Sequence, residues 1–324
     1  MLVTALLSDE ITVGAFAAVF NSIGVMFSIM REMINRQIGN IASNIGKSHN
    51  FIRFMERPER GGIDYVPIYD KGIIADNISF TYPNANNKSV DNVSLEIKSG
   101  ETVAIVGKNG AGKTTLVRLL MGLYIPTEGK VIINGIETRK ANSKSIFCGI
   151  SGVFQNYQRY QMTLKENIQI SDTGNMHPID NAIEQVGIDI NSPSFPSGYS
   201  TILSREFDGV DLSGGEWQRI AIARGIYRVH NVIVLDEPTA SIDPIEESRI
   251  YRKFVEISEG KTAIIVTHRL GAAKIADRVI VMDKGKIIDF GSHYELMQKN
   301  GLYARMFNSQ ASWYQETVPY RYSN

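Results

Sequence analysis

A glycine-rich segment around residue 110 has the residue types and spacing of a phosphate-binding loop. In GKNGAGKTT, Gly107, Gly112, Lys113 and Thr114 satisfy the pattern G-x-x-x-x-G-K-[ST]. The glycines let backbone N–H groups wrap a polyphosphate, the lysine neutralises the β- and γ-phosphates, and the threonine hydroxyl reaches Mg²⁺. A chance glycine-rich turn is the weaker interpretation, because a short apolar strand precedes the loop. We therefore predict a nucleoside triphosphate site formed by Gly107, Lys108, Asn109, Gly110, Ala111, Gly112, Lys113, Thr114 and Thr115.

Two adjacent carboxylates form a second candidate group. Asp236 and Glu237 directly follow the apolar stretch Val232–Leu235. Ligands bind at the carboxyl ends of strands in parallel α/β sheets, so a buried strand would deliver both side chains to the site. We expect Asp236 to hold Mg²⁺ through water and Glu237 to polarise the attacking water. Two solvated loop carboxylates are the alternative, which the phosphate loop elsewhere in the chain disfavours.

The elements that must position these residues can also be read from the sequence. Short runs rich in β-branched residues predict strands at Ile73–Phe80, Val90–Ile97 and Thr102–Val106. Asn134–Gly135, in KVIINGIETR, predicts a two-residue hairpin turn. Strands alternating with helical segments around a phosphate loop indicate the α/β class.

A different pattern occupies the start of the chain. The stretch Ile11–Met30 contains no charged side chain, and about twenty such residues in a helix span a bilayer core of roughly 30 Å. A secretion signal would have positive charges before this stretch, but Asp9 and Glu10 precede it. Arginines and lysines follow it, so the positive-inside rule predicts the remainder on the cytoplasmic side. An amphipathic core helix of a soluble domain is the alternative from this stretch alone.

The helical pattern continues beyond the apolar stretch. Isoleucines recur at threes, fours and sevens up to Met55, which predicts a long amphipathic helix. Pro58, Gly61 and Gly62 then interrupt the pattern, so residues 58–72 are expected to form a linker between two domains.

Composition limits the class of protein. The 324 residues include 34 Lys+Arg and 34 Asp+Glu, so the net charge is zero and no global field attracts nucleic acid. With 43% hydrophobic and 21% charged residues, the chain has the composition of a globular protein. The single cysteine, Cys148, cannot form an internal disulfide, which suits a reducing cytosol.

A third motif lies between the phosphate loop and the two carboxylates. Leu212, Ser213, Gly214, Gly215 and Glu216 open a helix with a serine hydroxyl and glycine amides, which is a second anion-binding helix end. One nucleotide does not need two such ends, but a nucleotide held by another copy of the chain could use the second. With its LSGGE stretch and the other motifs in this order, the chain from Ile73 to Gln298 resembles the ATP-binding cassette family.

The resemblance implies further site residues. Tyr82 matches the aromatic residue that stacks on adenine, and Gln155 matches the glutamine near the metal. Ser213, Gly214, Gly215 and Glu216 match the signature, although Glu216 stands where glutamine is commoner. Asp243 matches the aspartate of the loop that crosses the dimer interface, and His268 matches the switch histidine at the γ-phosphate. The implied metal residues are Thr114, Gln155 and Asp236, and the implied catalytic residues are Glu237, His268 and Lys113.

The resemblance also implies a fold and an organisation. A P-loop NTPase cassette has a mixed β-sheet core, an antiparallel β subdomain and a helical signature subdomain; here a long transmembrane and cytoplasmic helix precedes it. We expect a truncated transmembrane domain at residues 1–57, resembling the end of the fifth helix, the sixth helix and its extension. A linker at 58–72, the cassette at 73–300 and a tail at 301–324 follow. YQRYQMTLKENI and REFDGVDLSGGEWQR look like exporters of lantibiotics and related peptides.

The expected function is that of an ATPase motor. Two chains, in a homodimer, would sandwich ATP and Mg²⁺ and drive export of a substrate such as a peptide across the cell membrane, together with the transmembrane helices of a full exporter. The ATPase domain would lie on the cytoplasmic side, and no nucleic acid would bind. A soluble cassette ATPase outside transport and a non-functional truncated remnant are the alternatives.

Overall fold

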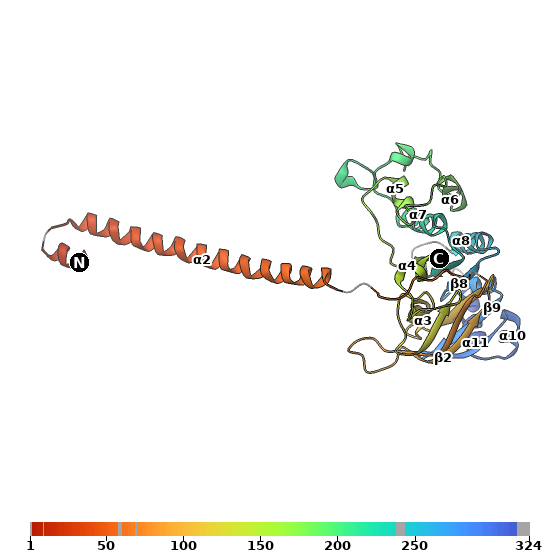
Figure 1. Cartoon of the computed structure of the whole chain (residues 1–324). Coiled ribbons are helices and arrows are strands. Elements are labelled where there is room, and N and C mark those ends of the chain that lie inside the picture. The colour runs from red at the N-terminus through yellow and green to blue at the C-terminus, as the bar shows by residue number, and fades with distance from the viewer. Residues whose placement is uncertain (1, 9, 58–59, 69, 238–243, 316–324) are drawn as a thin grey trace, which may run out of the picture. The chain divides into compact units, whose positions relative to one another are not determined.

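The computed structural model describes residues 2–8, 10–57, 60–68, 70–237 and 244–315. The chain divides into two compact units, Met1–Glu59 and Arg60–Asn324. The first unit is helical, and the second contains both β-sheets, the other helices and the phosphate loop (Figure 1).

The first unit consists of α1 (Leu2–Leu7) and the long helix α2 (Val13–Met55). The Thr12 hydroxyl caps the start of α2 by accepting a hydrogen bond of 3.2 Å from the Ala15 N–H. One stretch of α2, Val13–Arg36, is long and apolar enough to cross a membrane, with a mean hydropathy of 1.8 and no burial within the chain. Large side chains such as Phe20, 69% exposed, therefore lie on the surface of this unit. The predicted apolar helix is confirmed and extends beyond Met30.

The second unit is built on two sheets. An antiparallel sheet has the strand order β2-β1-β4-β5, and a six-stranded sheet has the order β10-β9-β3-β8-β7-β6. In the larger sheet β9, β3, β8, β7 and β6 run parallel, and β10 pairs antiparallel with β9. The strands are β1 (Ile73–Phe80), β2 (Val90–Ile97), β3 (Thr102–Gly107), β4 (Glu128–Ile133), β5 (Ile136–Glu137), β6 (Ile150–Phe154), β7 (Val232–Asp236), β8 (Thr262–Val266), β9 (Arg278–Asp283) and β10 (Lys286–Gly291).

The predicted strands are confirmed, and so is the mixed α/β cassette fold. β1 and β2 have the expected bounds, and β3 extends the expected strand by one residue, Gly107. Asn134 and Gly135 both have positive φ, 50° and 80°, and join β4 to β5 in a tight hairpin. The strands at the centre of the larger sheet are entirely buried, as expected for parallel strands covered on both faces.

Helices cover the larger sheet and form a separate helical layer. In this layer Trp217, Ile220 and Leu164 pack into one apolar cluster, which differs from the cluster beneath the phosphate loop around Leu116. The helices are α3 (Lys113–Leu120), α4 (Ser143–Phe147), α5 (Leu164–Gln169), α6 (Asp180–Gln185), α7 (Gly214–Tyr227), α8 (Pro244–Ile257), α9 (Leu270–Ala273), α10 (His293–Gln298) and α11 (Leu302–Gln315), with 3₁₀ turns at Gly198–Ser200 and Arg205–Phe207. The signature helix and the phosphate loop thus rest on different hydrophobic clusters.

Residues 60–68, within the expected linker, attach to the cassette. The Arg60 guanidinium donates hydrogen bonds to the backbone carbonyls of Gly122 and Thr138. Farther along, the Ile68 N–H donates to the Asn134 carbonyl at 2.9 Å. Gly122 follows the phosphate-loop helix α3, so Arg60 places a positive charge at the carbonyl end of that helix.

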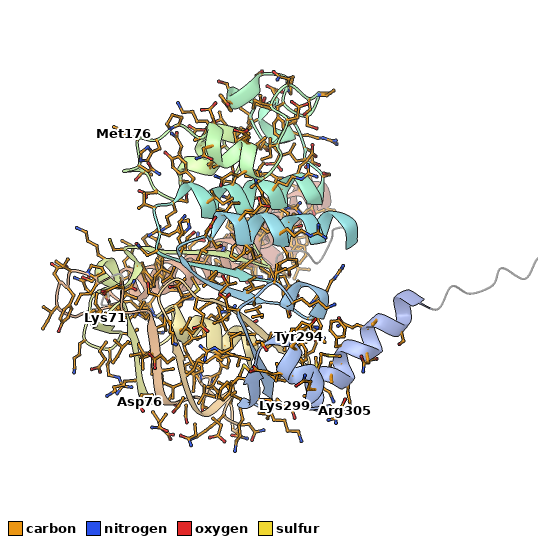
Figure 2. The ribbon with its side chains drawn as sticks, turned by 90° about the vertical axis from the view of Figure 1, so that its right-hand side faces the viewer. Lys71, Asp76, Met176, Tyr294, Lys299 and Arg305 are labelled. Carbon is orange, nitrogen blue, oxygen red and sulfur yellow. The ribbon has the colours of Figure 1, made fainter. Side chains whose placement is uncertain are left out.

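The C-terminal part of the described chain forms the pair α10 and α11. Figure 2 shows Tyr294 and Lys299 of this region beside Arg305 of α11, away from Asp76 on the antiparallel sheet. Tyr303 of α11 is 1% exposed and belongs to an apolar cluster with Leu270 and Leu296. α11 is therefore packed onto the cassette through its first turns.

Candidate functional site

The register of the larger sheet brings the motifs to one edge. Ile105 of β3 pairs with Val266 of β8, Val266 with Asp236 of β7, and Asp236 with Phe154 of β6. These four residues form a row across neighbouring parallel strands. The phosphate loop begins two positions after that row, His268 follows it by two, and Glu237 and Gln155 follow it by one, so parallel pairing gathers them at the carboxyl edge, where ligands bind.

The phosphate loop has a backbone that only glycine permits at two points. Gly112 has φ 95° and caps the start of α3, and a Cβ there would collide with the Ser89 carbonyl. A Cβ on Gly107 would collide with the Met282 carbonyl. Gly285, in the turn between β9 and β10, donates its N–H to the Ala111 carbonyl at 3.0 Å. The pocket at the loop has a volume of about 550 Å³ and is also lined by Lys88 and Lys284.

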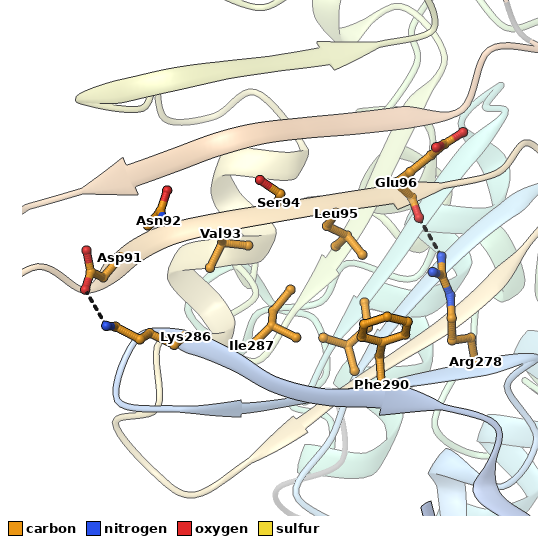
Figure 3. A pocket seen from close by; sticks show the side chains of 11 residues that line it. Asp91, Asn92, Val93, Ser94, Leu95, Glu96, Arg278, Lys286, Ile287 and Phe290 are labelled. Atoms are coloured by element: carbon orange, nitrogen blue, oxygen red, sulfur yellow. Dashed lines mark hydrogen bonds and ion pairs between the residues drawn. The ribbon is translucent and has the colours of Figure 1, made fainter. Parts of the chain in front are cut away.

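That β9–β10 turn is itself tied to the antiparallel sheet. Asp91 of β2 donates its N–H to the Gly285 carbonyl at 2.9 Å, and its carboxylate pairs with Lys286 at 3.1 Å. Figure 3 shows the Asp91–Lys286 pair at one end of a groove of about 390 Å³ between β2 and β10, with Arg278 bonded to the Glu96 carbonyl at the other end. The two sheets are thus joined beside the phosphate loop, and Gly285 carries this connection to the loop backbone.

The side chain of Lys113 lies inside the loop and faces the carboxylate of Glu237. Its Nζ donates to the carbonyls of Gly107 at 3.1 Å and Lys108 at 3.3 Å, and lies 3.5 Å from Glu237 Oε1. Lys113 is 6% exposed. A buried cation in a ring of carbonyls and amides is placed to pair with phosphate oxygens.

Asp236 has the surroundings of a cation ligand. It is 4% exposed and accepts a hydrogen bond of 3.4 Å from the Thr114 hydroxyl. Burial, and then the neighbouring Glu237 carboxylate, raise the pKa of Asp236 to about 6. Among the described residues no group of three or more His, Cys, Asp or Glu side chains is arranged to hold a metal. One carboxylate and one hydroxyl instead fit Mg²⁺ bound chiefly through water and substrate phosphates.

Glu237 changes the direction of the chain at the end of β7. Adjacent side chains on a strand point to opposite faces, but Glu237 has φ 44°, in the left-handed region. This turn allows both carboxylates to serve one site. His268 Nδ1 lies 3.6 Å from Glu237 Oε2, and the polar contact with His268, followed by the charge of Lys113, holds the pKa of Glu237 below its usual value against the effect of burial. The carboxylate is therefore charged and able to accept a proton at neutral pH.

Tyr82 lies beside the phosphate-loop helix. Its hydroxyl is 3.1 Å from the Thr115 hydroxyl, and its ring meets those of Phe80 and Tyr124 edge-on, with centroids 5.1 and 5.8 Å apart. Arg118 donates to the Tyr124 hydroxyl at 3.0 Å and completes this cluster. Gln155 is exposed and directly follows β6, next to the strand that ends in Asp236.

The signature residues start α7 in a closed capping arrangement. The Ser213 hydroxyl and N–H donate to Glu216 Oε2 at 2.7 and 2.8 Å, and Ser213 Oγ accepts from the Glu216 N–H at 3.3 Å. Burial of Glu216 is outweighed by hydrogen bonds from Ser194 and Ser213, which lower its pKa and keep it charged. Gly214 and Gly215 have open space where a Cβ would lie. Asp243 is outside the described residues.

Sequence reasoning missed several residues at this site. Arg118, Tyr124 and Gly285 are brought in by the tertiary structure, as are Lys88 and Lys284. The Lys284–Gly285 turn between two apolar strands was the available signal for the hairpin, but nothing local shows that it closes on Ala111.

The fold and the site define the class as a P-loop nucleotide-binding protein. The ABC transporter family matches residues 90–240. The chain is 37% identical to the subtilin transport ATP-binding protein SpaT of Bacillus subtilis, over 87% of this chain and 46% of SpaT. It is 36% identical to the nisin transport ATP-binding protein NisT of Lactococcus lactis subsp. lactis, over 72% of this chain and 40% of NisT.

A solved structure agrees with these relatives. The structure of a bacterial Atm1-family ABC exporter with ATP bound superposes with a TM-score of 0.72 at 29% identity, covering 93% of this chain and 53% of that chain. The chain thus contains an ABC transporter ATP-binding domain, of the ATPase family, and is homologous to the subtilin and nisin transport ATP-binding proteins. It spans less than half the length of SpaT and of NisT.

Proposed function

We propose that this chain is the ATP-hydrolysing motor of an ABC exporter. The observation that carries the proposal is the convergence of Lys113, Glu237 and His268 at the edge of one parallel sheet, with Glu237 within 3.6 Å of both partners. The printed names of the homologues, transport ATP-binding proteins for subtilin and nisin, support a transport role.

The residues at the edge have complementary roles in this proposal. The phosphate-loop amides and Lys113 bind the β- and γ-phosphates, while Tyr82 contacts adenine. Thr114, Asp236 and Gln155 hold Mg²⁺, which when bound neutralises charge on the phosphates. Glu237 accepts a proton from the attacking water, and His268 orients Glu237 and contacts the γ-phosphate. Displacement of the Lys113 Nζ from Glu237 towards a phosphate would free the carboxylate for the water.

A second copy completes the site in this proposal. α7 and the phosphate loop belong to different apolar clusters, and the start of α7, where two glycines have open space at their Cβ positions, is a helix end that can bind an anion. We propose that Ser213, Gly214 and Gly215 face the γ-phosphate bound by a partner chain, with Asp243 at the same interface. Such a homodimer would have two equivalent sites related by a two-fold axis.

The apolar part of α2 gives the motor a membrane attachment. The exposed stretch Val13–Arg36 matches a bilayer in length, and the cassette lies on the side of the following arginines, that is, the cytoplasmic side. We propose that α2 is part of the transmembrane domain of an exporter and that the cargo is a peptide of the lantibiotic type.

Two substitutions test the motor. Lys113→Ala should abolish ATP binding, measured with a fluorescent ATP analogue on the purified chain in detergent. Glu237→Gln should retain binding, lose phosphate release, and accumulate as an ATP-bound dimer in light scattering. Lys299→Ala and Glu256→Gln are matched controls, because both side chains are exposed and lie outside the site.

Chelation of Mg²⁺ should stop hydrolysis in the unsubstituted chain, and added Mg²⁺ should restore it. Normal hydrolysis by Glu237→Gln would show that the base is another group. Unchanged ATP binding by Lys113→Ala would refute the assignment of this loop as the site that binds the ATP phosphates.

A further inference from the structure

The side chain of Gln310, on the C-terminal helix α11, holds the backbone next to His268. Its Oε1 accepts a hydrogen bond of 2.9 Å from the Leu270 N–H, and its Nε2 donates to the His268 carbonyl at 2.5 Å. The side-chain amide of Gln310 thus bonds the backbone on both sides of Arg269, at the His268 carbonyl and at the Leu270 N–H. These two hydrogen bonds span 40 residues of sequence or more and connect α11 to the loop that presents His268.

α11 is anchored firmly enough to act as a support. Tyr303 is 1% exposed, and its hydroxyl lies 2.7 Å from His293 Nδ1 of α10. Lys274, just after α9, places its ammonium 4.6 Å from the centre of the Phe307 ring. Packing against α9 and α10 therefore fixes α11 on both sides, and Gln310 follows Phe307 by one helical turn.

The loop to which Gln310 is hydrogen-bonded determines where the His268 side chain points. β8 ends at Val266, and α9 begins at Leu270, so three residues make the turn. Within it, Thr267 Oγ1 accepts from the Arg269 N–H at 2.9 Å and from the Tyr251 hydroxyl at 3.3 Å. α8 thus supports the turn through Thr267, and α11 supports it through His268 and Leu270. His268 Nδ1 lies 3.6 Å from Glu237, so a change in this turn would move the ring relative to the carboxylate.

We propose that Gln310 is a positioning residue for ATP hydrolysis, which holds the turn at residues 267–270 so that His268 faces Glu237 and the γ-phosphate. The C-terminal helix thereby controls the hydrolytic step through the backbone of this turn, without Gln310 itself contacting Glu237. This inference rests on the proposed ATPase function and deepens it. Binding of ATP itself depends on the phosphate loop and is independent of Gln310.

The test uses two variants of Gln310 in the full chain. Gln310→Met keeps the length of the side chain and removes both hydrogen bonds, whereas Gln310→Glu keeps the acceptor for Leu270 and sets a carboxylate oxygen against the His268 carbonyl. Both should lower kcat about tenfold, because small displacements of catalytic groups have large kinetic effects, and both should leave KM for ATP within about twofold. Asn308→Ala, at an exposed position on the same helix, is the control and should retain normal kcat.

A double-mutant cycle separates positioning from general damage. If Gln310 acts through His268, then Gln310→Met should have no further effect on kcat in a His268→Ala background. Additive losses in the cycle, or a loss that appears in KM and not in kcat, would overturn the proposal.

Amide hydrogen exchange tests the two Gln310 hydrogen bonds independently of ATP hydrolysis. In the protein without nucleotide, Gln310→Met should speed exchange of the Leu270 amide, while the Asn308→Ala control should not. Unchanged exchange in Gln310→Met would overturn the proposal even if the chain proved to be an active ATPase. If Gln310→Met speeds exchange of the Leu270 amide but the unsubstituted chain does not hydrolyse ATP, the two Gln310 hydrogen bonds are supported and only the proposed ATPase function is refuted.

Discussion

The burial of Asp236 should make this carboxylate a source of instability at neutral pH. Its pKa rises from 3.8 to about 6, because burial and the adjacent Glu237 both disfavour its charge. The folded chain then binds a proton more tightly than the unfolded chain. This contribution to stability is fully present below the unfolded pKa and is lost as the pH rises through about 6. At neutral pH the difference of about two pKa units corresponds to about 3 kcal/mol of lost stability.

Asp236→Asn should recover much of that free energy. The amide has the same size and keeps an oxygen for the Thr114 hydroxyl, but it carries no charge. We expect a gain of up to about 3 kcal/mol at about pH 7.5, and about a third of that gain at about pH 4.5, where Asp236 is largely protonated. For a unit of this size a gain of 3 kcal/mol raises Tm by roughly 6–12 °C. ATP hydrolysis should be lost at the same time.

Thermal unfolding of both proteins at the two pH values measures this effect, with the fluorescence of the buried Trp217 as the probe. Asp289→Asn is the control, since this partly exposed carboxylate pairs with Lys299 on the surface. The reasoning would be refuted by a variant that is less stable than the unsubstituted chain at about pH 7.5. An equal gain at both pH values would also refute it, because desolvation of a charge requires a gain that fades on acidification.

Two further predictions concern the supports of the site. Gly225→Leu should destabilise the chain by about 2 kcal/mol or more, because even a Cβ would lie 2.6 Å from the Val153 side chain; Gly271→Ala, where no atom lies within 4 Å, should be neutral or better in the same denaturant titration. Arg60→Met should cost about 2 kcal/mol, since the carbonyls of Gly122 and Thr138 lose a charged donor, and a loss below about 0.5 kcal/mol would contradict this.

Motifs whose geometry is local were predictable from the sequence. The phosphate loop, the Asn134–Gly135 hairpin and the strand before Asp236 each follow from a few neighbouring residues. The strands β1 and β2 have the bounds that their residue types indicate, because β-branched residues suit a partly buried pleated surface.

Contacts between distant segments were not predictable in this way. Gln310 is an ordinary polar residue of an amphipathic helix, and only tertiary packing brings its amide to His268. Arg60 lies in a stretch whose glycines indicate a loop, and nothing local identifies the carbonyl of Gly122 as its partner. The left-handed conformation of Glu237 was equally hidden, because glutamate, unlike glycine or asparagine, has no local preference for it and adopts it only where the surrounding structure requires it.

The backbone of Glu237 has a consequence for how such a chain changes over generations. A left-handed glutamate is strained by about 1–2 kcal/mol, which glycine would relieve at a single step. Most random substitutions in a protein reduce stability, but substitutions at this position can increase it while ending activity. Replacing Glu237 would also remove the carboxylate beside the buried Lys113 ammonium, and relief of the backbone strain would offset part of that cost in a lineage that no longer needed the ATPase. If the chain hydrolyses ATP as proposed, selection for that reaction would keep a glutamate in this conformation.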